Sequence, residues 1–228
     1  PAPALTTAVT KMKMELVLDS GASFNESAVK RAIATQTGVD PEKVLIKEIV
    51  HKVKVTYSFS ASVDEAVAKT AISEAHGVPV EKVLVTITNA RRRLSADRFM
   101  GRRLSVDVAV VILADTAEAA SDLMTKAEDV AAITQKLSDT GVSAEATLTV
   151  APKQAVELVT EIISMDSTPV PEPDPTQLAA IGTALGATAT CSDVEKTIPT
   201  TSPPSIDVDV AQILLPGSMA FSLVLFGL

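Results

Sequence analysis

Aromatic side chains and cysteine are scarce in this chain of 228 residues. It has no Trp, one Tyr and five Phe, and its single cysteine is Cys191. A lone cysteine excludes an internal disulfide framework and any multi-cysteine metal site. So few aromatic rings argue against base-stacking platforms and aromatic cages. A core must therefore be built from Ala, Val, Ile, Leu and Thr.

Catalytic signatures are also missing from the sequence. The two histidines, His51 and His76, lie far apart and form no Ser-His-Asp pattern or ligand set with other residues. There is no glycine-rich phosphate loop, and the carboxylates are scattered over positions expected to be exposed. We therefore predict a protein that is not an enzyme, with no catalytic residue, no metal site and no cofactor.

The negative net charge limits the kinds of molecule that the chain is expected to bind. The formal net charge is −8 and the pI is about 4.8, so the chain repels nucleic acid and we predict no nucleic-acid partner. Hydrophobic residues make up 46% and charged residues 21%, which predicts a folded core. The length fits one large or two small domains.

An internal repeat is the strongest pattern present. Residues 25–33 align with residues 64–72 at a shift of 39, and residues 42–45 align with residues 81–84 at the same shift. Eight or more identical positions in one register are not expected by chance. The repeat predicts two copies of one structural unit.

Each copy has the pattern strand, helix, strand. Period-two alternation marks strands, Asn25 and Asp64 are candidate helix N-caps, and Gly38 and Gly77 are candidate helix ends. With a hairpin turn near residues 50–52, residues 11–89 predict a β-α-β-β-α-β unit, the ferredoxin-like arrangement. The predicted strands are 12–18, 44–50, 53–59 and 83–88.

Residues 104–165 predict a second, divergent α/β unit. Residues 104–114 are typical of a strand, and residues 116–139 are helical in pattern with a break near 128–130. Residues 144–150 alternate as a strand. Residues 155–163 fit a strand or a helix, and we favour a strand. The predicted fold class is α+β, with two ferredoxin-like (βαββαβ-type) units.

An arginine-rich segment, residues 90–103, joins the two predicted units. We interpret it as an exposed linker or long hairpin, with four open roles: a docking patch for an acidic partner or anionic lipid, kinase sites at Ser95 and Ser105, dibasic processing sites, or a solvated linker. It holds six of the seven arginines of the chain, Arg91, Arg92, Arg93, Arg98, Arg102 and Arg103.

The C-terminal part predicts a proline- and threonine-rich stalk over residues 166–205 and a transmembrane segment over residues 206–228. Residues 210–228 carry no charge, and as a helix they would span about 28 Å, close to the ~30 Å of a bilayer core. The alternatives are a buried terminal strand or helix and, ranked last, a lipid-anchor signal. The main predicted membrane contacts are Val210, Ile213, Leu214, Leu215, Phe221, Leu223, Val224, Leu225 and Phe226.

The N-terminus, Pro-Ala-Pro-Ala-Leu, lacks Met and a signal-peptide pattern. It indicates either a processed mature form or a fragment, and we favour processing. With acidic residues flanking the apolar segment, we expect the folded part on the luminal or extracytoplasmic side of an organellar membrane.

A resemblance to a group of known proteins indicates the cellular setting that we expect. The Arg-Arg-Leu-Ser sequence that runs into residues 106–110 and an Ala/Glu/Asp-rich helix resembles a group of dinoflagellate algal proteins with SEA-like, ferredoxin-like repeats. The likeness covers residues 12–165 and carries over no functional residue. It implies a lineage-specific subunit of a thylakoid complex, with a luminal domain and one apolar helix.

Together these patterns predict a non-catalytic accessory subunit of a membrane protein complex, namely a photosystem in an algal thylakoid, that assists assembly or stabilisation. The predicted partners are integral membrane subunits of the photosystem core or antenna. The alternative is a secreted or surface-anchored SEA-like adhesion module, and an enzyme on the same scaffold ranks last.

Overall fold

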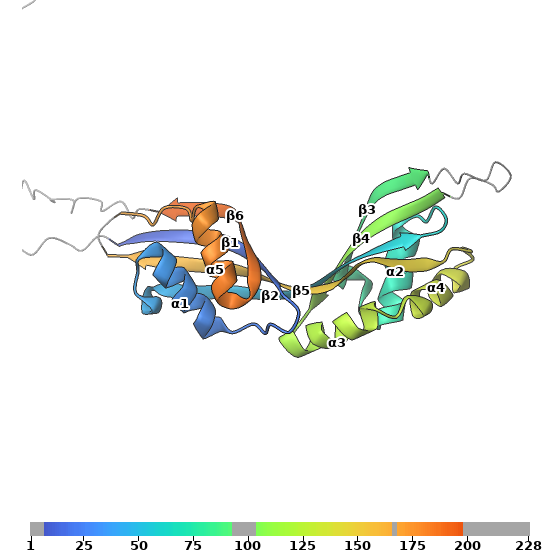
Figure 1. The fold of residues 1–228 in the computed structure, drawn as a ribbon, viewed down its shortest axis with the longest axis horizontal. Helices are drawn as coiled ribbons and strands as arrows, with labels where there is room; N and C mark the ends of the chain where they lie inside the picture. Colours follow the sequence, from blue (N-terminus) through green and yellow to red (C-terminus); the bar gives the residue numbers. More distant parts are fainter. Residues whose placement is uncertain (1–6, 93–103, 166–167, 198–228) are drawn as a thin grey trace, which may run out of the picture.

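The computed structural model describes residues 7–92, 104–165 and 168–197, and these form a single six-stranded antiparallel sheet with helices packed on it (Figure 1). The strand order is β3-β4-β2-β5-β1-β6. The strands are β1 (Ala8–Leu18), β2 (Val44–Phe59), β3 (Val83–Arg92), β4 (Leu104–Ala114), β5 (Ala146–Ser164) and β6 (Ala187–Thr197). The α-helices are α1 (Glu26–Thr37), α2 (Glu65–His76), α3 (Ala117–Ala127), α4 (Val130–Asp139) and α5 (Pro175–Leu185), and two short 3-10 helices are η1 (Pro41–Lys43) and η2 (Val80–Lys82).

Two long strands, β2 and β5, run through the whole sheet and define two lobes. The terminal lobe contains β1, β6, α1, α5, the first part of β2 and the second part of β5, where β1 pairs with residues 155–164. The central lobe contains β3, β4, α2, α3, α4 and the other parts of β2 and β5, where β4 pairs with residues 51–59. The central lobe is thus an insertion between the two parts of the terminal lobe (Figure 1).

The two copies of the sequence repeat lie in different lobes. The first copy forms β1, α1 and the start of β2, and the second forms the end of β2, α2 and β3. Each copy is therefore the first β-α-β unit of its lobe. Its neighbours in the sheet come from β4 and β5, far along the chain, and the two copies do not complete one unit together.

The prediction of two successive ferredoxin-like units is wrong. No hairpin forms near residues 50–52, because β2 continues through them without a break. The sequence Val50-His51-Lys52 offers no glycine, proline or asparagine for a tight turn, and the period-two pattern continues on both sides.

The predicted stalk is corrected in the same way. Asp174 and Gln177 form a capping box that starts α5, and Gly186, with a φ of 60°, ends it. The following strand β6 pairs antiparallel with β1 along most of its length. Residues 174–197 therefore belong to the folded terminal lobe.

Most of the predicted local signals are found in the described residues. The Asn25 side chain accepts a hydrogen bond from the Ala28 amide at 3.0 Å, and Gly38 ends α1 with a φ of 71°. Asp64 precedes α2, but no hydrogen bond from its side chain caps that helix. The helical stretch breaks at Glu128, and Asp129 caps α4. Residues 155–163 are a strand, as favoured.

Each lobe has its own core on the helix-covered face of the sheet. Buried side chains alternate with outward ones along β1 and β4, so only one face is buried. The central core gathers around Tyr57, Phe59 and Ile133, and the terminal core around Met14, Leu16 and Ile33. The other face of the sheet is left for solvent or a partner.

No helix in residues 7–92, 104–165 and 168–197 is long and apolar enough to cross a membrane. The transmembrane helix of the predicted fold is therefore not part of this structure. The residues named for it, from Val210 to Phe226, lie outside the described part of the chain.

Candidate interaction surface

On the terminal lobe, the sheet face away from the helices carries paired charges. Glu161 of β5 lies 3.1 Å from Lys47 and 3.9 Å from Lys11. Glu157, four residues earlier, contacts Lys13 at 2.6 Å and also Lys52. Each glutamate on the middle strand is thus held by one lysine from each neighbouring strand.

These contacts shift the titration of Glu157. Partial burial alone would raise its pKa, but hydrogen bonds and charge attraction from Lys13 and Lys52 outweigh burial and lower the pKa. The pKa of Lys13 is raised, chiefly by its hydrogen bond to Glu157. This face is therefore charged but locally neutralised, which suits contact with water.

The same face of the central lobe has a different composition. The outward positions of β4 are Ser105, Asp107, Ala109, Val111 and Leu113, all half-buried, and Asp107 is the one charged residue among them. Across from Ala109 lie Thr86 of β3 and Thr56 of β2. A sheet face of small, apolar and threonine side chains results.

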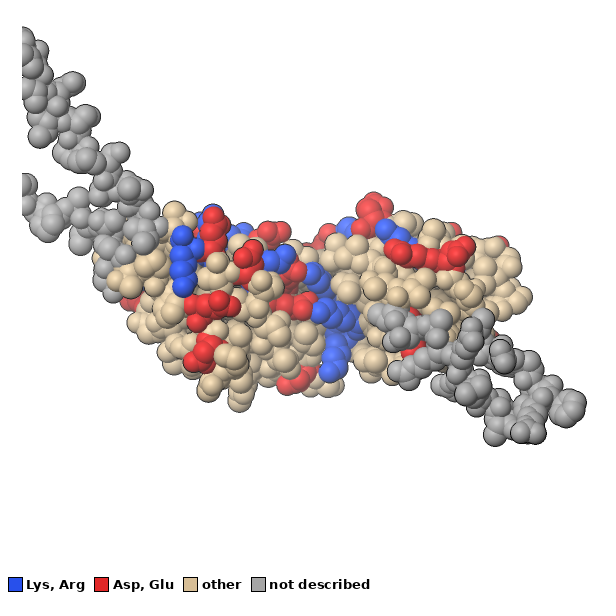
Figure 2. All heavy atoms as spheres, turned by 90° about the horizontal axis from the view of Figure 1, so that it is seen from above, with Lys and Arg blue, Asp and Glu red and all other residues tan. Residues whose placement is uncertain are grey.

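Exposed apolar side chains gather at the edges of this lobe. Of the seven large hydrophobic residues that are exposed in the described part of the chain, five belong to the central lobe. Figure 2 shows charged side chains spread over the left half of the molecule and in a band at its waist, whereas in the right half, the central lobe, those in view gather toward the upper margin. Exposed apolar side chains grouped at an edge are typical of interaction sites. The five residues are Val80, Leu84 and Ile87 at the β3 edge, and Leu148 and Val150 at the opposite, β5 edge.

The arginine-rich segment starts at the outer end of this surface. Arg91 and Arg92 are the last residues of β3, paired with Ser105 and Leu104 of β4. The predicted docking patch therefore begins on the β3–β4 pair at the far end of the central lobe (Figure 1). Its other members, Arg93, Arg98, Arg102 and Arg103, lie outside the described residues.

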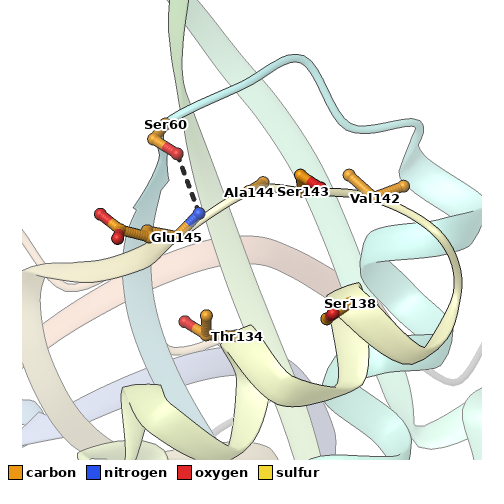
Figure 3. A pocket seen from close by; sticks show the side chains of 7 residues that line it. All are labelled: Ser60, Thr134, Ser138, Val142, Ser143, Ala144 and Glu145. Carbon is orange, nitrogen blue, oxygen red and sulfur yellow. Dashed lines mark hydrogen bonds between the residues drawn. The ribbon is translucent and has the colours of Figure 1, made fainter.

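A polar cavity of about 490 Å³ lies between α4 and the segment that follows β2 (Figure 3). Ser60 Oγ accepts a hydrogen bond from the Glu145 amide at 2.8 Å, and Thr134 Oγ1 accepts one from the Ala146 amide at 3.0 Å. These hydroxyls hold the start of β5 in place. The lining has one charged side chain, that of Glu145, and no histidine or lysine.

A second cavity, of about 520 Å³, lies at the waist between the lobes. Its charged lining residues are Asp19 of the β1–α1 loop, Glu128 just after α3, and Lys153 of β5. Within the described residues, no three His, Cys, Asp or Glu side chains are grouped as a metal site requires.

The two histidines and the cysteine lie in half-buried or buried positions. His51 packs edge-on against Phe24 with ring centroids 5.7 Å apart, and burial lowers its pKa. His76 is buried, its Nδ1 lies 2.8 Å from the Ile72 carbonyl oxygen, and burial lowers its pKa as well. Burial also raises the pKa of the Cys191 thiol, which disfavours the reactive thiolate.

Comparisons with protein-family models, curated proteins and solved structures gave no match to this chain.

Proposed function

We propose that this chain is a non-catalytic binding module that docks a partner protein on the open sheet face and edges of the central lobe. The observation that carries the proposal is the difference between the two lobes on one continuous sheet. On the terminal lobe, lysine and glutamate pairs cover the face away from the helices. On the central lobe, the equivalent face has mainly threonine, alanine and valine, and its charged residues include Asp107 and Lys54, which is paired with Glu15.

The composition of the surface defines the partner that it suits. Threonine and small apolar side chains on a flat sheet favour a partner with its own apolar face, because neither side then buries an unpaired charge. The arginines at the outer end favour acidic residues at one margin of that partner.

A matched pair of substitutions tests the proposal. Val111 and Val159 are both half-buried, outward-facing valines on inner strands, and each has a lysine directly opposite, Lys54 and Lys13. Lys54 is already paired, with its Nζ 2.6 Å from Glu15 Oε2. We therefore expect Val111→Glu to lower recovery of the native partner at least about tenfold, because docking would bury the added carboxylate without a free cation beside it, at a cost of more than about 1.4 kcal/mol. Val159→Glu, on the terminal lobe, serves as the control.

The measurement is quantitative co-purification of the tagged chain from its source, with wild type, Val111→Glu and Val159→Glu compared side by side. Partners lost with Val111→Glu and kept with Val159→Glu support the proposal. Equal recovery with both variants, or loss only with Val159→Glu, contradicts it.

Within this class, the assignment to a photosystem of an algal thylakoid stays a prediction, as does the luminal location. It rests on the sequence resemblance and on the charge-free residues 210–228. Co-purification with pigment-binding integral membrane subunits is the expected result. A full chain that stays monomeric and soluble without detergent, free of such subunits, would contradict it.

A further inference from the structure

The sheet has four stretches of unpaired edge, and three of them carry features that prevent pairing with another strand. The β6 edge holds Asp193, Glu195 and Lys196 and a register shift opposite Lys13 and Met14. The edge at the start of β2 holds Lys47 and Glu48 at another shift. Charges and bulges of this kind are the usual means of blocking an edge strand. Proline, which also blocks an edge strand, occurs in the edge at the start of β5.

That third edge, residues 146–153, has two register shifts against β2 and contains Pro152 followed by Lys153. Proline cannot donate a backbone hydrogen bond, so regular pairing stops there. This edge, too, is protected.

The β3 edge is the least protected of the four. Residues 83–87 pair with β4 without a register shift, the shift in this strand comes after them, between Ile87 and Asn89, and no charged residue occurs from Val83 to Ala90. Leu84 is 50% exposed and Ile87 is 41% exposed, and Val80, just before the strand, is 40% exposed. An uncharged, regular and apolar edge of this kind is a template for another strand.

The charges at the two ends of β3 favour one orientation for that strand. Glu81 lies exposed at the entrance to β3, and Arg91 and Arg92 follow the uncharged run. The neighbouring Lys82 is already paired, with its Nζ 2.6 Å and 2.8 Å from the two carboxylate oxygens of Asp115. An antiparallel second copy would set the acidic end of each β3 next to the basic end of the other.

We propose that β3 pairs antiparallel with β3 of a second copy of this chain, related by a two-fold axis. Centred on Val85, the pairing sets Leu84 of each copy opposite Thr86 of the other on the outward face. The two sheets become one, and the exposed Val80, Leu84 and Ile87 are covered. Because the other described edges are blocked, association stops at the dimer.

This inference goes beyond the proposed function, because it concerns the edge and not the face of the central lobe. Strand pairing over so few residues buries less area than a standard interface, so we expect micromolar dissociation. A failure of self-pairing would leave docking on the face, tested by Val111→Glu, unaffected.

The experiment uses sedimentation velocity on the full chain over a range of concentrations. One variant carries Leu84→Lys and Thr86→Lys, and a second carries Leu84→Glu and Thr86→Glu. Since position 84 faces position 86 across the proposed axis, each variant alone places four like charges together. Mixed in equal amounts, the two variants place lysine opposite glutamate. The control, Thr188→Lys with Thr190→Lys, changes two outward positions of the β6 edge.

We expect dimers for the wild type and the β6 control, monomers for each β3 variant alone, and dimers again in the mixture. Recovery in the mixture separates pairing from misfolding, because a misfolded variant would not regain a defined dimer. A wild type that is monomeric throughout, or a β3 lysine variant that associates as the wild type does, overturns the proposal. So does a mixture that stays monomeric.

Discussion

Tyr57 links the sheet to the helix layer of the central lobe through one hydrogen bond. Its side chain is fully buried, and its hydroxyl donates to the Ala127 carbonyl oxygen, at the end of α3, over 2.8 Å. Burial raises the pKa of the phenol far above its usual value near 10. In a chain with a single tyrosine, this residue is a spectroscopic probe of the central core.

Tyr57→Phe should lower the free energy of unfolding by about 1–2 kcal/mol, because the Ala127 carbonyl loses its partner while the ring still fills the site. Urea denaturation followed by circular dichroism measures this loss. In the wild type, alkaline titration followed by tyrosinate absorbance should show no ionisation until the protein unfolds. Ionisation near pH 10 in the folded state would contradict the burial of Tyr57.

At the same scale, Glu157 gives a pH-dependent contribution. Because its pKa is lowered in the folded state, the stabilisation from its lysine contacts is present above the ordinary glutamate pKa and is lost as pH falls through the folded value. The carboxylate is 21% exposed and screened, so Glu157→Gln should cost at most about 1 kcal/mol at pH 7. The difference between variant and wild type should vanish in acid. A difference independent of pH between 3 and 7 would argue against the ion pairs.

At the scale of helices and strands, the packing of α5 on β6 depends on one close backbone contact, at Gly182. A Cβ at Gly182 of α5 would lie 2.4 Å from the Ala187 carbonyl oxygen, a backbone atom that cannot move aside cheaply. Gly182 therefore lets the helix fold back directly onto the strand that follows it. The small-residue pattern around Gly182 is visible in the sequence, but the strand that it packs on is not.

Gly182→Ala should destabilise the protein by about 1–3 kcal/mol, although alanine favours helix by ~1 kcal/mol over glycine. Thr183→Ala, the next residue and exposed, is the matched control and should leave stability nearly unchanged. Urea denaturation measures the free energy of unfolding of both variants. Equal values for the two would show that α5 does not pack this closely on β6.

Element positions could be predicted from sequence because caps, glycines and period-two alternation are local signals. Asn25, Gly38 and the break at Glu128 are examples. Strand pairing could not be predicted, because alternation says which residues share a face and not which strand lies beside them. The threonine- and alanine-rich face of the central lobe could not be predicted for the same reason. Thr56, Thr86 and Ala109 come from three strands, and only the register brings them together.

At the scale of the whole molecule, two strands decide the architecture. β2 and β5 run through both lobes, and the terminal lobe is closed only when β1, at the start of the chain, pairs with residues 155–164. The repeat suggested that residues 11–89 fold as one unit, since its two copies adjoin in sequence. In the fold, each copy completes its sheet with strands from much later in the chain.

This architecture places two chemically different surfaces on one rigid sheet. The terminal lobe presents neutralised lysine and glutamate pairs, whereas the central lobe presents threonine, alanine and valine with an open apolar edge. The binding role proposed for the chain depends on that division. The same division predicts that the partner does not bind at the polar cavity near Ser60 and Glu145.

Hydrogen–deuterium exchange of the full chain, free and within its native assembly, shows directly which surface a partner covers. We expect slowed exchange in peptides from β3 and β4, and unchanged exchange in β1, β6 and the residues around Ser60. Protection confined to the terminal lobe, or to the cavity between β2 and α4, would contradict a docking surface on the central lobe.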